Sequence, residues 1–275
     1  MTKLSKICYA IIEVKNEMKK SRIISKILLT LFAAIFLFSG IMVFNIIHSN
    51  RVAARLNNEL AQHLSFSQQP NNSTDEVDEY FTLPENIVLP NVDFDALYEM
   101  NSNVVAWIII PGTAINYPVV HYSDNERYLY HLFDGTRNRT GAIFADARNN
   151  EIFTDKHTII YGHNMNNGSM FAQITRYRSQ EFFEENPYVF LLTPTGNYAV
   201  VLFAGYTANT SASSWNRNFE DDYAFEEWAT ERQQRSDFVS NIEIKPTDRI
   251  VTLSTCTNVN RDGRYVIAGR LLPIR

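Results

Sequence analysis

Hydrophobic residues are unevenly distributed along the chain, and the longest uninterrupted run lies near its beginning. No residue from Ile27 to Ile47 is charged. As a helix this run is about 30 Å long, which matches the hydrocarbon core of a bilayer. A cleaved secretory signal usually has a shorter apolar region, about 7–15 residues, although Val52-Ala53-Ala54 resembles a weak cleavage site. The length favours a retained transmembrane anchor over residues 27–47, preceded by a head over residues 1–26.

The stretch that follows is mostly polar. Leu56, Leu60 and Leu64 have helical spacing and predict a short polar helix that continues from the membrane. Residues 65–74 are too polar to bury a face, and Pro84 and Pro90 interrupt regular structure. We therefore expect a stalk or linker over residues 48–92.

Short apolar runs separated by turn residues fill the rest of the chain, residues 93–275, and predict β-strands. Asp93 and Asp124 are placed to cap short helices, and Pro118 suggests a strand edge or start. Few helices and about eight short strands favour a mainly β domain built as a closed eight-stranded barrel, because closure removes exposed edges. The strands are expected at residues 104–110, 117–120, 141–144, 157–161, 188–192, 198–206, 249–254 and 265–272.

One longer helix is predicted before the strand at 249–254, over residues 222–234. Phe225, Trp228, Ala229 and the stem of Arg232 recur at helical spacing and form one face. Acidic residues gather at its start and arginines at its end, which suits the helix dipole. We expect this helix to pack over the barrel.

The distribution of charge predicts the orientation of the chain in the membrane. The net charge of −5 gives no indication of nucleic-acid binding, but residues 1–26 are rich in Lys and Arg. A basic flank before a membrane span stays in the cytoplasm, so the following residues are expected outside the cell.

The two cysteines, Cys8 and Cys256, would then lie on opposite sides of the membrane and could not form a disulfide with each other. Cys256 follows Ser254 and Thr255 at the end of a strand, where a thiol is placed like a nucleophile. A buried structural cysteine is the alternative, since free cysteine packs as a small hydrophobe. A lone thiol on the oxidising side of a membrane favours a functional role.

Nucleophilic cysteine catalysis needs a base or ion-pair partner and a group that stabilises the oxyanion. Among the histidines, His163 stands out because it follows a strand and a glycine, Gly162, that lets the backbone turn. Arg264 begins the last strand, which is expected to pair with the strand ending at Cys256. Arg261 and Arg270 are its rivals, and a structural role for each of these side chains stays open on pattern alone.

Several separate motifs, in order, resemble the sortase family, the membrane-anchored cysteine transpeptidases of Gram-positive bacteria. The resemblance covers residues 93–275 and is strongest for class B. It rests on Thr252-Leu253-Ser254-Thr255-Cys256 with Arg264, on Tyr161-Gly162-His163-Asn164-Met165, and on the stretches 103–108, 115–120, 141–146 and 168–171.

This resemblance implies roles for individual residues. Cys256 is the expected nucleophile, His163 its acid/base partner, and Arg264 the clamp for substrate and oxyanion. Ser254, Thr255, Asn164 and Thr257 are expected to contact substrate, although Thr257 stands where class B members often have an acidic residue.

The implied reaction is acyl transfer from a C-terminal sorting signal of a secreted protein, through a thioacyl-enzyme, to an amine of a lipid-linked cell-wall precursor. The alternatives are a pilin polymerase that uses a lysine amine, a cysteine hydrolase, and a membrane-tethered binding module with an inert Cys256. No cluster of carboxylates indicates a metal site, so no cofactor is expected.

Overall fold

The computed structural model describes residues 3–66, 79–209, 213–256 and 263–275; the side chains of residues 1–13, Asn16 and Cys256 lie outside this description. It contains two compact units, Met1–Arg51 and Val52–Arg275. Helix α1, Lys3–Leu60, runs through the first unit and into the second. The first unit is therefore a single helix.

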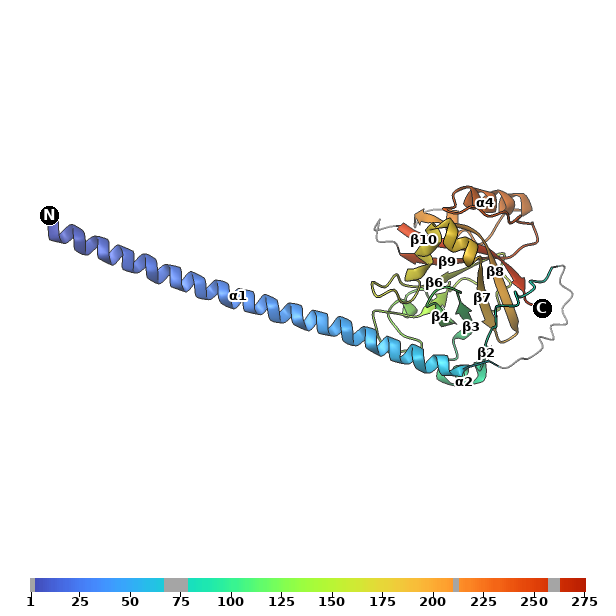
Figure 1. The fold of residues 1–275 in the computed structure, drawn as a ribbon, viewed down its shortest axis with the longest axis horizontal. Helices are drawn as coiled ribbons and strands as arrows, with labels where there is room; N and C mark the ends of the chain where they lie inside the picture. The colour runs from blue at the N-terminus through green and yellow to red at the C-terminus, as the bar shows by residue number, and fades with distance from the viewer. Residues whose placement is uncertain (1–2, 67–78, 210–212, 257–262) are drawn as a thin grey trace. The chain divides into compact units, whose positions relative to one another are not determined.

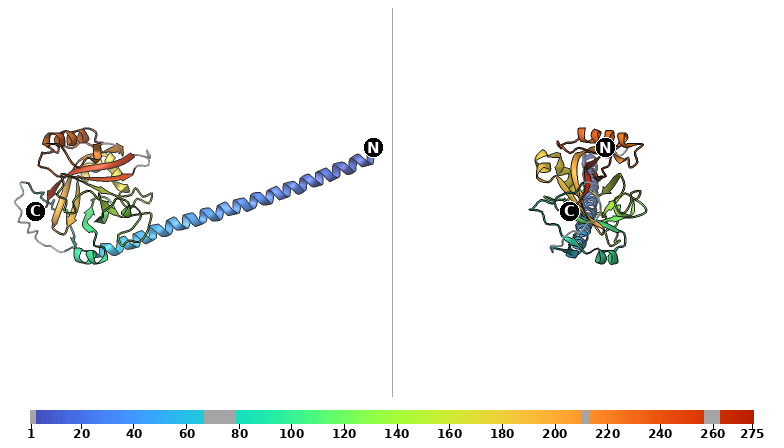
Figure 2. Two further views of the ribbon diagram at one scale, coloured as in Figure 1. Left: turned by 180° about the vertical axis from the view of Figure 1, so that it is seen from behind. Right: turned by 90° about the vertical axis from the view of Figure 1, so that its right-hand side faces the viewer.

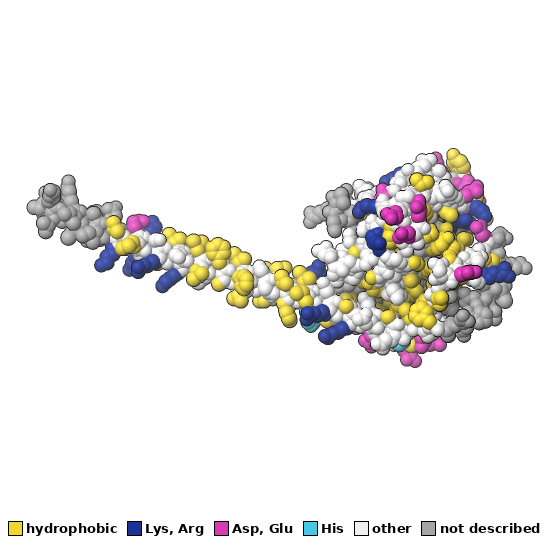
Figure 3. Space-filling view, in the orientation of Figure 1, with side chains coloured by type: hydrophobic (Ala, Val, Ile, Leu, Met, Phe, Trp, Pro, Cys, Tyr) yellow, Lys and Arg dark blue, Asp and Glu magenta, His cyan; other side chains and the backbone are white. Residues whose placement is uncertain are grey.

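The apolar part of α1 is a candidate membrane span. It lies within Glu17–His63, and the side chains of Leu29, Phe36 and Phe44 are all more than half exposed. Figure 3 shows hydrophobic side chains along the middle of this helix. A solvent-exposed apolar surface of this length suits a lipid environment, and the anchor predicted over residues 27–47 lies within this candidate span.

The second unit is a closed barrel of eight strands in the order β10-β8-β7-β3-β4-β5-β6-β9 (Figure 1), as the sequence predicts. All neighbours are antiparallel except the parallel pairs β4–β5 and β6–β9. The strands are β3 (Val104–Ile109), β4 (Asn116–His121), β5 (Ile143–Ala145), β6 (His157–Tyr161), β7 (Tyr188–Thr193), β8 (Gly196–Asn209), β9 (Ile250–Cys256) and β10 (Gly263–Pro273). A second, two-stranded sheet joins β1 (Leu64–Ser65) to β2 (Asn91–Val92).

Pro118 does not start a strand, because it lies inside β4 and pairs with Trp107 of β3. The pairing of β4 with β5 begins only at Val119. At Pro118, β4 therefore has β3 as its only neighbour, which is the edge position that the sequence suggests. A proline is tolerated there because one side of the strand needs no N–H donor.

Short helices cover the barrel. They are α2 (Phe94–Met100), η2 (Arg127–Leu129), η3 (Ala172–Arg178), α3 (Gln180–Glu185), η4 (Ser213–Trp215) and α4 (Asp222–Gln234), with η1 (Ala61–His63) after α1. Asp93 caps α2 by accepting the Ala96 N–H at 3.0 Å, as predicted. The Asp124 carboxylate accepts the N–H groups of Glu126 and Arg127, but the helix it precedes is the short 3-10 helix η2.

Helix α4 confirms the prediction from its periodicity. Phe225, Trp228, Ala229 and Arg232 are its buried residues. They share a hydrophobic cluster with residues of β8, β9 and β10. The ribbon shows α4 lying over this side of the barrel (Figures 1 and 2). The opposite face of β9 and β10 contributes Val251, Leu253, Tyr265 and Ile267 to the largest buried cluster.

A further outer cluster includes residues that precede β2. Ala53, Leu56 and Leu60 are buried there together with Leu97 and Trp107. Downstream, Phe81 forms a parallel bridge with Ile274 at the end of β10 and packs edge-on against Tyr188. Parts of the segment at 48–92 thus fold with the barrel unit.

Candidate active site

Three neighbouring strand ends meet at one rim of the barrel. In the parallel pair β6–β9, Tyr161 lies opposite Ser254, and the Gly162 N–H donates to the Ser254 carbonyl at 3.1 Å. In the antiparallel pair β9–β10, the backbone of Cys256 lies directly opposite Arg264. The predicted pairing of these last two strands is confirmed, and the register brings residues 163, 256 and 264 to the same rim.

A pocket of about 260 Å³ opens at this rim. Among the predicted site residues, His163, Ser254, Thr255 and Arg264 line it. The remaining lining residues are Asn125, Leu129, Phe144, Tyr161 and Gly162. Asn164 is not among them and instead bridges Met170 through its backbone. Thr257 lies outside the described residues.

The ring of His163 is oriented by a backbone carbonyl. Its Nε2 lies 2.8 Å from the carbonyl oxygen of Leu129. Because a carbonyl only accepts hydrogen bonds, Nε2 carries the proton, and in the neutral ring Nδ1 is left as an acceptor.

Gly162 is needed because there is no room for a side chain at this position, and not because the backbone turns sharply there. It is not among the glycines with positive φ, which corrects the expectation from the sequence. A Cβ at this position would lie 2.6 Å from both Ile143 Cδ1 and Phe171 Cγ. The glycine therefore lets β6 end against a tightly packed layer and sets the backbone that carries His163.

Ser254 and Thr255 both line the pocket, but as neighbours on β9 their side chains point to opposite faces of the strand. Each residue is 1% exposed, and within the described structure neither Ser254 Oγ nor Thr255 Oγ1 has a hydrogen-bond partner. Buried polar groups are normally paired. Ser254 lies opposite the pocket residue Tyr161, so its hydroxyl is suited to a ligand that supplies the missing partner, such as a peptide backbone. The Thr255 side chain shares its face of β9 with Leu253, which is part of the barrel interior.

The other histidine on β6 has a structural environment. His157 is fully buried, with Nδ1 2.6 Å from the carbonyl of Asn216 and Nε2 2.8 Å from Thr252 Oγ1. Burial lowers its pKa from 6.5 to about 4, so the ring is neutral at physiological pH. His121 and His131 lie away from the pocket, with Nδ1 3.2 Å from Glu151 and 2.7 Å from the Arg127 carbonyl respectively.

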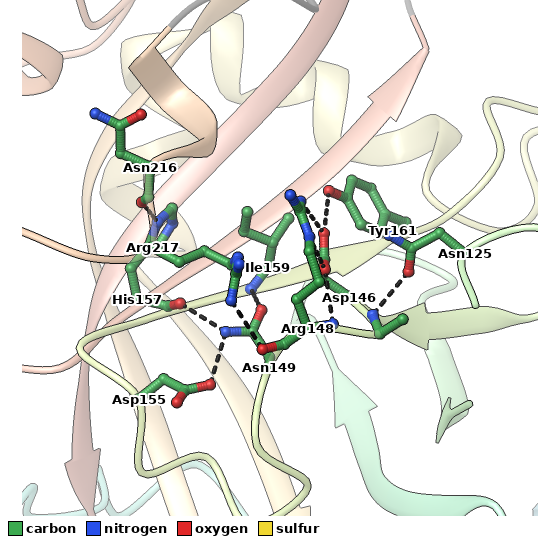
Figure 4. Close-up of polar contacts among 11 residues, drawn as sticks. Asn125, Asp146, Arg148, Asn149, Asp155, His157, Ile159, Tyr161, Asn216 and Arg217 are labelled. Atoms are coloured by element: carbon green, nitrogen blue, oxygen red, sulfur yellow. Dashed lines mark hydrogen bonds and ion pairs between the residues drawn. The ribbon is translucent and has the colours of Figure 1, made fainter. Parts of the chain in front are cut away.

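Asn125, Phe144 and Tyr161 line the pocket but were not assigned to the site from the sequence. Figure 4 shows Asn125 and Tyr161 held by the turn after β5: Tyr161 donates to Asp146, and Asn125 Oδ1 accepts the Ala147 N–H at 2.7 Å. The available signal was their position, since Tyr161 precedes Gly162-His163 and Asn125 follows the capping residue Asp124. Among the described residues no group of three His, Cys, Asp or Glu is arranged to hold a metal ion.

Comparison with known proteins adds an independent finding. Residues 108–272 match the family model of the sortase domain. The chain is 38% identical over 179 residues to sortase B of Listeria monocytogenes, covering 64% of this chain and 72% of that protein. It is 30% identical over 183 residues to sortase B of Staphylococcus aureus, covering 66% and 75%.

Solved structures agree. The S. aureus sortase B–substrate complex matches with a TM-score of 0.63 and 30% identity, over 66% of this chain and 85% of that one. Sortase B of Bacillus anthracis in complex with AAEK1 matches with a TM-score of 0.67 and 28% identity, over 84% and 99%.

Proposed function

The chain belongs to the sortase family of cysteine transpeptidases and resembles its class B members, and from that premise we propose how its own residues carry out the transfer. Cys256 attacks the carbonyl carbon of the scissile bond in a C-terminal sorting signal. A thioacyl-enzyme forms as the amine leaves, and an amine acceptor then resolves the intermediate. The acceptor is an amine of a lipid-linked cell-wall precursor.

The observation that supports this proposal most strongly is the meeting of three strand ends. Residues two apart on a strand share a face, so position 256 lies on the same face of β9 as Ser254, which lines the pocket. Arg264 lies directly opposite position 256 in the register of β9 and β10, so the two positions share a face of the sheet.

Each residue of the rim then has a distinct task. His163 receives the thiol proton at Nδ1, the nitrogen that the Leu129 carbonyl leaves free, and returns it to the leaving amine. The Arg264 guanidinium donates hydrogen bonds to the carbonyl oxygen as negative charge develops on it. Ser254 offers its unpaired hydroxyl to the substrate peptide, and Thr255 lines the pocket beside it.

Membrane attachment fits the same role. We propose that residues 27–47 anchor the chain, with residues 1–26 in the cytoplasm and the barrel outside, because the Lys- and Arg-rich flank precedes the span. Tethering at the outer surface raises the effective concentration of the enzyme near secreted substrates and lipid-linked acceptors.

The test is incubation of the full chain in detergent with a panel of sorting-signal peptides and candidate amines, with products identified by mass. Amide products with a wall-precursor amine support the proposal. Transfer only to a lysine amine of a pilin-like peptide indicates a polymerase, and cleavage without transfer in the presence of amine indicates a hydrolase. No product with any peptide, together with no adduct at Cys256, indicates a binding module.

A further inference from the structure

An ion pair between a buried aspartate and a half-exposed arginine lies next to the pocket wall, in the turn that follows β5. The Asp146 side chain is fully buried, whereas that of Arg148 is 56% exposed. Arg148 donates to both carboxylate oxygens, from Nε to Oδ1 and from Nη2 to Oδ2, each at 2.8 Å. Its backbone N–H adds a third hydrogen bond to Oδ1 at 3.0 Å.

The fourth hydrogen bond to this carboxylate comes from a wall of the pocket. Tyr161 donates its hydroxyl to Asp146 Oδ2 at 2.9 Å (Figure 4). Burial raises the pKa of Asp146, but the hydrogen bonds from Arg148 and Tyr161 outweigh it and hold that pKa well below its usual range. The carboxylate is therefore ionised, and it fixes the direction of the Tyr161 hydroxyl.

The Tyr161 ring is held on its apolar sides as well. It packs against Phe144 at 5.3 Å between ring centroids and lies 6.3 Å from the ring of Trp215. Burial, followed by the charge of Asp146, raises the pKa of the Tyr161 hydroxyl, so it stays protonated. The phenol serves as a fixed donor to Asp146 rather than as an acid or base.

The same turn also orients a second pocket residue. The Ala147 N–H donates to the side-chain amide of Asn125 at 2.7 Å. Because an N–H only donates, the atom that faces it is Oδ1, and the NH₂ group of Asn125 is left without a hydrogen-bond partner among the described residues. The Arg148 carbonyl in turn accepts from Arg217 Nη1 at 2.8 Å, which ties the turn to the segment before α4.

We propose that the Asp146–Arg148 ion pair is a positioning unit of the peptide pocket: it fixes the Tyr161 ring and, through the turn, the Asn125 amide in the arrangement that the substrate meets. This rests on the proposed function, in which the pocket holds the sorting-signal peptide. Neither Asp146 nor Arg148 lines the pocket, so both act through other residues.

The chain offers a matched control. Asp248 is also buried, and its carboxylate accepts from Arg270 Nη2 at 2.9 Å and from the Lys245 N–H at 2.6 Å. It also forms an ion pair with Arg270, whose Nε lies 2.8 Å from Oδ2. This pair lies beside Glu79 and Pro273 and shares no residue with the pocket. Asp248→Asn therefore removes an equivalent buried charge without touching the proposed site.

The experiment compares full-length Asp146→Asn, Tyr161→Phe, the double variant and Asp248→Asn in detergent, using the peptide and amine that the unmodified chain joins. Asp146→Asn is expected to lower kcat/KM about tenfold, mainly by raising KM for the peptide, because a misplaced wall weakens positioning. Alkylation of Cys256 by iodoacetamide is expected to keep its rate. The double variant should lose no more than the worse single variant, and Asp248→Asn should lower Tm similarly while keeping kcat/KM.

Equal losses of Tm in Asp146→Asn and Asp248→Asn with kcat/KM unchanged in both would overturn the proposal, as would additive losses in the double variant. If Asp146→Asn does not fold, Arg148→Gln carries the same expectation, since the Arg148 side chain is more than half exposed. Absence of transfer by the unmodified chain refutes the proposed function itself, whereas transfer that Asp146→Asn and Arg148→Gln leave unaltered refutes only the positioning role.

Discussion

The buried imidazole of His157 makes the stability of the barrel depend on pH in a specific window. The ring lies between α4 and the two parallel strands β6 and β9, with its centroid 4.7 Å from that of Trp228. Its two nitrogens bond the Asn216 carbonyl and the Thr252 hydroxyl. A carbonyl accepts only, so Nδ1 carries the proton of the neutral ring and Nε2 accepts from Thr252.

The size and sign of the effect follow from the two pKa values. The unfolded chain takes up a proton near pH 6.5, whereas the folded chain does so only near pH 4. Above pH 6.5 the two states bind the same number of protons at this site, and as the pH falls from 6.5 to 4 the unfolded state gains one first. The free energy of unfolding is therefore expected to fall by about 3 kcal/mol across this window through His157 alone.

The assay is urea unfolding followed by tryptophan fluorescence at pH 7.5, 6, 5 and 4. All three tryptophans, Trp107, Trp215 and Trp228, lie in the barrel unit. Carboxylates also make the free energy of unfolding depend on pH. The quantity compared is therefore the slope of the free energy of unfolding against pH for the unmodified chain, minus the same slope for His157→Gln.

A matched control is His131→Gln, since His131 is only partly buried and forms an isolated β-bridge with Arg137, outside the cluster that packs under α4. The His131→Gln variant should show the same change of the free energy of unfolding with pH as the unmodified chain. Equal slopes for the unmodified chain and His157→Gln between pH 6.5 and 4 would refute the reasoning.

Two further predictions concern packing. Gly162→Ala is expected to lower the free energy of unfolding by about 1–3 kcal/mol, because its Cβ overlaps Ile143 and Phe171; an unchanged urea midpoint would contradict the account of that glycine. Leu60→Ala, at a fully buried position of the outer cluster, is expected to cost about 2–5 kcal/mol in the same assay, whereas Val88→Ala, at a 69% exposed position, should stay within about 0.5 kcal/mol. A Leu60→Ala effect as small as that of Val88→Ala would show that this segment does not fold with the barrel.

Much of the fold was predictable because it depends on local sequence patterns, namely turn residues between strands and the spacing of apolar residues. The eight strands are separated by residues that favour turns, and the buried face of α4, Arg232 included, follows the helical period. The pairing of β9 with β10 followed from their closeness in sequence, and it placed Arg264 opposite Cys256. The spacing of Leu56 and Leu60 predicts a helix but gives no indication of which surface that helix covers.

The second layer of the candidate site was less predictable because it depends on register between distant segments. Tyr161 reaches Asp146 only because β5 pairs with β6, and Asn125 reaches Ala147 across 22 residues. The edge position of Pro118 within β4 likewise depends on a distant segment, since β5 begins to pair with β4 only at Val119. Local propensity does not contain such long-range information.

The central claim is that Cys256 carries the acyl group. The most direct test is the intact mass of the full chain after incubation with a sorting-signal peptide in the absence of an amine acceptor. The account predicts a mass gain equal to the acyl portion of the peptide, located at Cys256, absent in Cys256→Ala and lost when the amine is added. A peptide adduct or a transfer product formed by Cys256→Ala, or no adduct on the unmodified chain with a peptide that it cleaves, would contradict it.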